Sequence, residues 1–186
     1  GVTVRTKAVQ RTRSMQNQVE NKNQFSRQIT TIFGIGKFRP APGTWGSAVA
    51  LPMLYVVHLI GSFPAVTLAT GVIFAIGWWA TAEQTKYRED HDPSEIVIDE
   101  VTGQWLALWP VSASSWHLGI DLIRLWPGWV AAFLLFRLFD ILKPGPVSWA
   151  DQRFDALGVM LDDVIAGLLA AVTVVLLAVG FHGLQF

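Results

Sequence analysis

The sequence predicts an all-α protein, in which a compact bundle of about five apolar helices is membrane-embedded behind a flexible basic N-terminal extension. Of its 186 residues, 52% are hydrophobic and only 15% are charged, whereas charged residues usually make up about 25% of a soluble domain. Residues 40–82 contain no Asp, Glu, Lys or Arg, and the last apolar run has more than 18 residues without a charge. No stretch alternates with the two-residue period of a strand. A soluble bundle with very apolar core helices is the alternative.

Residues 1–28 are polar and lack periodicity, which predicts a flexible extension in front of a single helical domain at residues 29–186. Residues 1–39 carry eight Lys or Arg and a single acid, Glu20. This excess of positive charge before an uncharged stretch indicates a cytoplasmic N-terminus. No basic domain with interleaved aromatic residues follows, so we expect no nucleic-acid partner. Polar residues continue to Gln28 ahead of any apolar region, which a signal peptide would not show.

The uncharged stretch predicts a helical hairpin. The Gly- and Pro-rich sequence FGIGKFRPAPGTWGS, residues 33–47, is expected to be a loop, with helical structure beginning near residues 44–47. The sequence GSFP at residues 61–64 divides the following run into two apolar segments, 46–60 and 64–80. Because each is slightly shorter than the ~20 residues of a perpendicular span, the pair is expected to cross the membrane or to lie deeply embedded in it.

Three further helices are expected after a charged linker at residues 83–95. Asp92 would cap the first of them, which would run to Trp109 and end where the sequence PVSASSWH breaks the pattern. A strongly apolar helix is predicted at residues 126–142. It is expected to end there because Pro144 and Pro146 follow closely. The last helix is expected to begin between residues 157 and 162 and to remain apolar to its end.

This order of helices predicts that three polar stretches meet on one membrane face. With a cytoplasmic N-terminus and every long apolar segment crossing, residues 34–47, 92–100 and 140–163 all lie at the cytoplasmic surface. Convergence of polar stretches that are far apart in sequence is what an active site requires. The acids would then lie at the ends of apolar segments, near the lipid headgroups.

The first acidic motif is DPSEIVIDEVTGQ, residues 92–104. Asp99 and Gly103 share one helix face, with Glu100 about 100° round the helix. Gly103 would leave room for a neighbouring helix or for a phosphate group. Helix capping explains Asp92 without any function, and a solvated face is the alternative for Asp99 and Glu100.

Two further motifs carry charge at predicted helix ends. Arg137, Asp140 and Lys143 are spaced by three residues and would share one side of a helix; an ordinary ion pair at the membrane interface is the alternative. Asp162 and Asp163 stand at the start of the last helix, where capping accounts for one acid but not for two. Clustered carboxylates in a chain without cysteine and with few, scattered histidines favour a hard cation, Mg²⁺ above all.

Four blocks together resemble the signature blocks of the phosphatidylglycerophosphatase A family: FRPAPGTWGS, DPSEIVIDEVTGQWLAL, RLFDILKPGPVSW and GVMLDDVIAG. They extend from about Phe33 to Gly167 in the order and spacing of that family. The resemblance implies a Mg²⁺-dependent phosphatase of the bacterial inner membrane with its active site on the cytoplasmic face. Such an enzyme removes the terminal phosphate of phosphatidylglycerophosphate in phospholipid biosynthesis, so that this lipid and the surrounding membrane lipids are its expected partners.

The resemblance also assigns roles to individual residues. The expected metal ligands are Asp99, Glu100, Asp140, Asp162 and Asp163. The expected catalytic residues are Asp99, Glu100, Asp140, Lys143 and Asp163, and the expected substrate-binding residues are Thr44, Ser47, Arg137 and Lys143. A phosphate at headgroup level needs such cations and a metal to neutralise the charge that develops on transfer.

Other functions remain open at this point. Without cysteine, a thiol phosphatase is excluded, and a metal-activated water is preferred to an aspartyl-phosphate intermediate. A related enzyme could act on another lipid or on a soluble phosphomonoester. A non-enzymatic carrier or scaffold is a further alternative, but a carrier needs charges in the middle of its apolar segments. The sequence also leaves a homo-oligomer open.

Overall fold

The computed structural model describes the chain except residues 1, 33–40, 86–95, 154 and 184–186. The described residues form helices joined by short connections and contain no strand, which confirms the all-α prediction. In chain order the elements are α1 (Val2–Thr30), α2 (Pro42–Thr85), α3 (Ile98–Leu118), η3 (Leu122–Leu125), α4 (Trp126–Leu142), α5 (Pro146–Asp151) and α6 (Ala156–Gly183).

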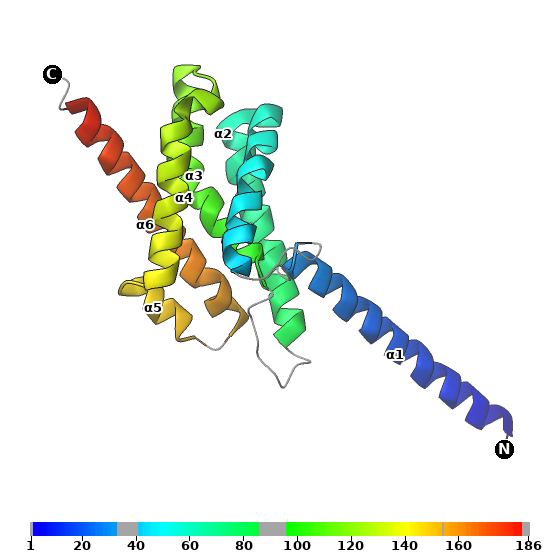
Figure 1. Ribbon diagram of the computed structural model, residues 1–186. Coiled ribbons are helices and arrows are strands. Elements are labelled where there is room, and N and C mark those ends of the chain that lie inside the picture. Colours follow the sequence, from blue (N-terminus) through cyan, green and yellow to red (C-terminus); the bar gives the residue numbers. More distant parts are fainter. Residues whose placement is uncertain (1, 33–40, 86–95, 154, 184–186) are drawn as a thin grey trace.

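The predicted hairpin is confirmed as α2, which folds back on itself in the middle (Figure 1). Gly61 and Ser62 leave the helical conformation there, with Ser62 at φ 55° and ψ −154°. Its two arms correspond to the apolar segments on either side of the predicted break. The first arm begins at Pro42, slightly before the predicted start, because proline suits the first turn of a helix, where its missing N–H would have no partner.

Helix α3 is the central helix of the bundle and lies among α2, α4 and α6 (Figure 1). Every residue from Ile98 to Leu108 is buried. The predicted end at Trp109 is wrong, because the helix continues through Pro110 to Leu118. Residues beyond the proline are still buried against neighbouring helices, so tertiary packing outweighs the one backbone hydrogen bond that Pro110 cannot donate.

Helices α3 and α6 cross in close contact. A Cβ atom added at Gly167 would collide with the backbone carbonyl of Gly103. One added at Gly103 would lie 2.5 Å from the Phe136 ring and 2.6 Å from the carbonyl oxygen of Asp163. Of the two expectations for Gly103, the neighbouring helix is therefore what occupies the space, and this close approach brings α6 and its two acids to the start of α3.

The remaining helices agree only partly with prediction. Helix α4 has the predicted bounds, 126–142, and α6 begins at Ala156, one residue before the predicted range. The short helix α5 was not predicted. The residues predicted to be a flexible extension, 1–28, lie almost entirely in the helix Val2–Thr30, which extends away from the bundle (Figure 1), and their flexibility stays a prediction. The predicted cap at Asp92 lies outside the described residues.

Among the α1 residues whose side chains are described, those that pack on the bundle lie in its C-terminal part. The Thr30 carbonyl accepts a hydrogen bond of 2.8 Å from the Val97 N–H, just before α3. Lys22 forms an ion pair of 2.9 Å with Glu83 at the end of α2. Described α1 side chains nearer the N-terminus are exposed, because a polar sequence offers no apolar face to bury.

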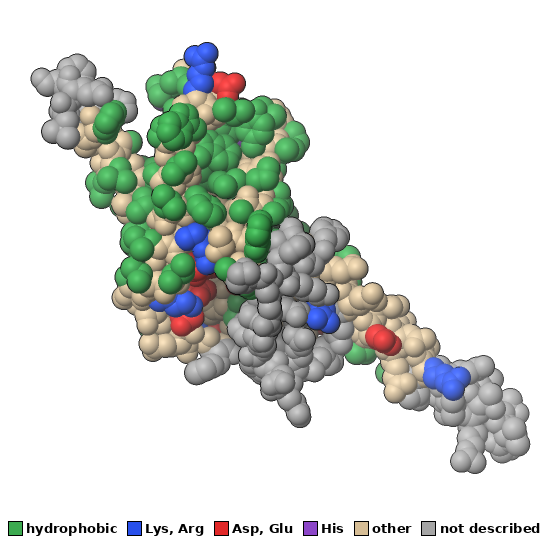
Figure 2. Space-filling view, in the orientation of Figure 1, with side chains coloured by type: hydrophobic (Ala, Val, Ile, Leu, Met, Phe, Trp, Pro, Cys, Tyr) green, Lys and Arg blue, Asp and Glu red, His purple; other side chains and the backbone are tan. Residues whose placement is uncertain are grey.

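The outer helices present apolar side chains to the surroundings. Within the described residues, three segments are long and apolar enough to cross a membrane: Pro42–Glu83, Leu122–Leu142 and Ala156–Phe181. Hydrophobic side chains cover the middle and upper part of the face shown in Figure 2, and charged groups lie below this area and also at its top. Large exposed side chains such as Ile60, Leu134 and Val179 belong to this apolar surface. The fold is that of a membrane protein.

Candidate active site

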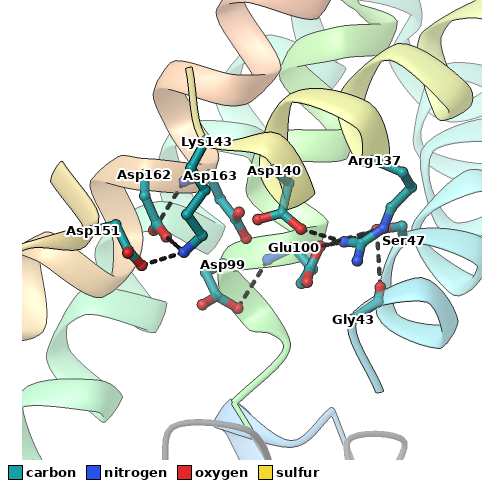
Figure 3. Close-up of polar contacts among 10 residues, drawn as sticks. All are labelled: Gly43, Ser47, Asp99, Glu100, Arg137, Asp140, Lys143, Asp151, Asp162 and Asp163. Atoms are coloured by element: carbon teal, nitrogen blue, oxygen red, sulfur yellow. Dashed lines mark hydrogen bonds and ion pairs between the residues drawn. The ribbon is translucent and has the colours of Figure 1, made fainter. Parts of the chain in front are cut away.

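The polar ends of four helices meet at one end of the bundle (Figure 3). The N-terminal turn of α3 supplies Asp99 and Glu100, the C-terminal end of α4 supplies Arg137 and Asp140, and Lys143 follows directly. The second turn of α6 supplies Asp162 and Asp163, and the first turns of α2 supply Ser47. The predicted convergence of distant polar stretches is confirmed for the described part of the chain.

Arg137 connects α4 to both α2 and α3. Its Nη1 lies 2.9 Å from Asp140 Oδ2, forms an ion pair with Glu100 Oε2, and lies 3.5 Å from Ser47 Oγ. The Ser47 hydroxyl also lies 3.1 Å from Glu100 Oε2 and 3.0 Å from the Gly43 carbonyl. A side chain at Gly43 would collide with Glu100, so the glycine of the GTWGS segment allows this approach. The ordinary i,i+3 pair of Arg137 and Asp140 is thus one contact of a larger network.

Lys143 organises the other side of the site. Its Nζ lies 3.1 Å from Asp162 Oδ2 and forms an ion pair with Asp151 of α5. Lys143 adopts φ 46° directly after α4, and its N–H bonds the Phe139 carbonyl at 2.8 Å. This left-handed residue ends the helix and turns the chain into α5. The site therefore has an arginine and a lysine on opposite sides of Glu100, Asp140 and Asp163 (Figure 3).

Three carboxylates lie close enough to share one cation. Oxygens of Glu100, Asp140 and Asp163 all lie within 4.8 Å of one another, and Glu100 and Asp163 are buried. When all five clustered acids, Asp99, Glu100, Asp140, Asp162 and Asp163, are ionised, they outnumber the cations Arg137 and Lys143 by three. Buried charge of this kind is costly unless a cation compensates it. An all-oxygen set of carboxylates therefore fits Mg²⁺ or a similar hard cation.

Burial changes the ionisation of the acids at the start of α3. Loss of hydration, and then the negative charges of Glu100, Asp162 and Asp140, raise the pKa of Asp99 well above its usual value, although the Glu100 N–H opposes this. Burial and Asp140 likewise raise the pKa of Glu100 to about 7, against the opposing effect of Arg137 and Ser47. Burial alone would lower the pKa of Lys143, but Asp151 and Asp162 raise it above its usual value. Lys143 is therefore a permanent cation near neutral pH.

Thr44 and Asp155 both stand apart from the cluster. Thr44, expected to bind substrate, is exposed on the first turn of α2, and its hydroxyl forms no hydrogen bond with the described residues of the site. Asp155 is exposed as well; its carboxylate pairs with Arg153 and accepts a hydrogen bond of 3.0 Å from the Gly158 N–H at the start of α6. Asp155, which was not a predicted site residue, is a helix cap. Apart from Thr44, the predicted site residues lie in the cluster.

Sequence reasoning missed Asp151 and Gln104. Asp151 shares Lys143 with Asp162, but it belongs to the short helix that was not predicted. Gln104 is fully buried one turn after Glu100, and among the described residues its amide has no hydrogen-bond partner; the Nε atom of Arg137 has none either. The i,i+4 spacing from Glu100 was the signal that could have singled out Gln104.

Apolar helices long enough to cross a membrane, with carboxylates and two cations gathered at one end, define a helical membrane protein with a charged site. Residues 28–178 match the family model described as Phosphatidylglycerophosphatase A. A Haemophilus influenzae protein named Phosphatidylglycerophosphatase A is 33% identical over 144 residues, which cover 76% of this chain and 82% of that protein. An Escherichia coli protein of the same name is 32% identical over 141 residues, 75% of each chain. The chain belongs to the phosphatidylglycerophosphatase A family and is a phosphatase.

A third relative carries a different name. A Bacteroides thetaiotaomicron protein named "Putative phosphatidylinositol-3-phosphatase" is 36% identical over 145 residues, which cover 75% of this chain and 85% of that protein. No solved structure matches the chain. Both kinds of relative are thus named as phosphatases of phosphorylated lipids, and they differ in the headgroup.

Proposed function

We propose that this protein hydrolyses phosphatidylglycerophosphate to phosphatidylglycerol and inorganic phosphate, with Mg²⁺, at the cytoplasmic face of a bacterial inner membrane. The observation that carries the proposal is the position of Glu100, Asp140 and Asp163 between Arg137 and Lys143, at the ends of apolar helices. A lipid phosphomonoester presents its phosphate at that level, and the names of the relatives agree with this substrate.

The two cations have a direct role in this reaction. Arg137 and Lys143 lie on opposite sides of the carboxylates, so each can bind phosphate oxygens and compensate the charge that develops on them. Arg137 presents a planar fork that suits a phosphate, and Lys143 acts as a point charge. Ser47 is placed by its contacts with Gly43 and Glu100 to donate a further hydrogen bond.

The carboxylates bind the metal and move protons. Glu100, Asp140 and Asp163 would hold Mg²⁺, with Asp162 beside them. When bound, the ion neutralises phosphate charge and lowers the pKa of water. Asp99 has a raised pKa and lies next to this group, so it can accept a proton from the attacking water. The water oxygen forms a bond to phosphorus as the bond from phosphorus to the glycerol oxygen breaks, and that oxygen takes up a proton.

A second candidate is hydrolysis of another lipid phosphomonoester, such as a phosphorylated inositol lipid. The relative from Bacteroides thetaiotaomicron favours it, because its identity to this chain, 36%, is higher than the 33% and 32% of the two other relatives. The same cluster would perform the same chemistry, since the phosphate is shared and only the headgroup differs.

The test is phosphate release by purified protein in mixed micelles. The substrates are phosphatidylglycerophosphate, phosphatidylinositol 3-phosphate and soluble glycerol phosphate, each assayed with Mg²⁺ and with excess chelator. We expect the first lipid to give the highest kcat/KM and chelator to abolish turnover. Preference for the inositol lipid would establish the second candidate, and full turnover in chelator would contradict the metal assignment.

A further inference from the structure

An apolar groove of about 250 Å³ lies between the first arm of α2 and the beginning of α4. Its lining residues are all aliphatic or aromatic: Leu51, Pro52, Tyr55, Ile123, Trp126 and Trp129. The groove is open to the outside, since Ile123 is 57% and Trp126 is 65% exposed. Tyr55 and Trp129 form its wall, with ring centroids 6.5 Å apart, and Trp129 is held by a hydrogen bond of 3.0 Å to the Leu122 carbonyl.

The groove and the candidate active site belong to the same helix pair. On α2, Ser47, Leu51 and Tyr55 follow one another at intervals of four residues and so lie along one face. On α4, Arg137 and Trp129 are eight residues apart and likewise lie along one face. These two faces meet at Ser47 and Arg137, since Arg137 Nη1 lies 3.5 Å from Ser47 Oγ. This polar end of the α2–α4 contact is the part of the site proposed above to bind phosphate. The groove is the apolar part of the same α2–α4 contact, farther along both helices.

The depth of the groove matches that of a lipid tail. With a rise of about 1.5 Å per residue, Tyr55 lies about 12 Å along α2 from Ser47, and Trp126 lies about 16 Å along α4 from Arg137. One leaflet of the hydrocarbon core is about 15 Å thick. A lipid whose phosphate is bound by Ser47 and Arg137 therefore has its acyl chains at the depth of Leu51 and Tyr55, and Trp126 lies near the depth at which a long chain ends.

We propose that the groove binds one acyl chain of the lipid whose phosphate occupies the active site, an inference that rests on the proposed function. The surrounding lipid is as apolar as the groove, so little is gained by transfer of the chain alone. What the groove supplies is orientation, because a chain held between Tyr55 and Trp126 limits the positions of the headgroup at Arg137. It makes the enzyme selective for phosphomonoesters that carry a long chain.

The first test compares two variants on substrates of two chain lengths. Ile123→Trp fills the far end of the groove, and Leu134→Trp places the same side chain on an exposed position of α4 outside it. For Ile123→Trp we expect kcat/KM to fall about tenfold on the dioleoyl substrate and to stay unchanged on the dihexanoyl substrate, whose chains end before the groove does. Leu134→Trp should leave both values unchanged. Equal effects of Ile123→Trp on both substrates would overturn the proposal.

The second test measures binding without turnover. A lipid phosphomonoester with a diazirine at the end of its acyl chain is irradiated with the wild-type protein in chelator, and a phosphatidylcholine with the same chain serves as the reference. We expect the phosphomonoester to label the peptide containing Trp126 and Trp129 more strongly, and Ile123→Trp to remove that excess. Equal labelling by both lipids would mean that the groove takes bulk lipid, and the proposal would be wrong. Lack of hydrolysis by the wild type would contradict the proposed function instead, and the labelling result would remain independent of it.

Discussion

Asp163 is the carboxylate that joins the Arg137 side of the site to the Lys143 side. It lies within reach of Glu100 and Asp140, and its neighbour Asp162 pairs with Lys143 at 3.1 Å. Removal of its charge by Asp163→Asn, with almost no change in volume, should lower turnover by at least ~10²-fold, which is typical of the loss of one strong electrostatic group. Phosphate release and a thermal unfolding curve of each variant measure the two effects separately.

The matched control for this prediction is Asp155→Asn. Asp155 is an exposed acid at the start of α6, and its role as a helix cap is one that asparagine also performs. It should keep normal turnover and stability. A reduced melting temperature with near-normal turnover in Asp163→Asn would show that the cluster is a structural network.

The raised pKa of Glu100 predicts how the stability of the metal-free protein depends on pH. Burial and Asp140 raise this pKa in the folded state to about 7, above the usual value near 4.5. The folded protein therefore binds a proton more readily than the unfolded chain, and stability should increase as pH falls from 8 to about 5. Asp99 acts in the same direction.

Thermal unfolding in chelator across this pH range tests the prediction. Glu100→Gln should flatten the dependence, since glutamine fills the same space and does not titrate. Glu20→Gln, an exposed position on α1, should leave the dependence as it is in the wild type. A melting temperature that rises with pH in the wild type would be opposite in sign to the expected effect.

At the scale of elements, the crossing of α3 and α6 determines where the acids lie. Gly167→Ala places a methyl group against the Gly103 backbone, where no flexible side chain can move aside. We expect a loss of about 1–3 kcal/mol in the free energy of unfolding, as for other overpacked positions, together with lower turnover because Asp163 moves with α6.

Gly71→Ala is the control for the helix crossing, because a Cβ atom at Gly71 in the second arm of α2 meets nothing within 4 Å. Alanine is the better helix former by about 1 kcal/mol, so this variant should be as stable as the wild type or more stable. Chemical or thermal unfolding of both variants in the same detergent gives the comparison. Equal stabilities would mean that the crossing tolerates a wider separation than the structure has.

At the scale of the whole molecule, the bundle has a charged end that carries the site and an opposite end at the α3–η3–α4 turn (Figure 1). The chain has no cysteine, so single cysteines can report accessibility without interference. In sealed vesicles, Gln28→Cys and Gln152→Cys should react from the same side and Arg124→Cys from the other. All three positions are exposed. Reaction of Gln28→Cys and Gln152→Cys from opposite sides would contradict a transmembrane bundle with a single polar face.

The sequence by itself determined those features that depend on neighbouring residues. The bounds of α4 and the break at Gly61 and Ser62 follow from where long apolar runs meet glycine, proline and polar residues. The charge-free run of α6 made a membrane segment recognisable. The resemblance to the family's motifs selected the acids and Lys143, because the chemistry of a side chain follows from the identity of the residue alone.

Only the tertiary structure decided which of these groups touch. Pro110 remains inside α3 because the residues beyond it are buried, and Thr44 faces outward while Ser47, one turn later, reaches Glu100. The partners of Arg137 on α2 and α3 are 90 and 37 residues away in sequence. Such contacts depend on the rotation and spacing of whole helices, which close packing at positions such as Gly103 sets and which no local pattern encodes.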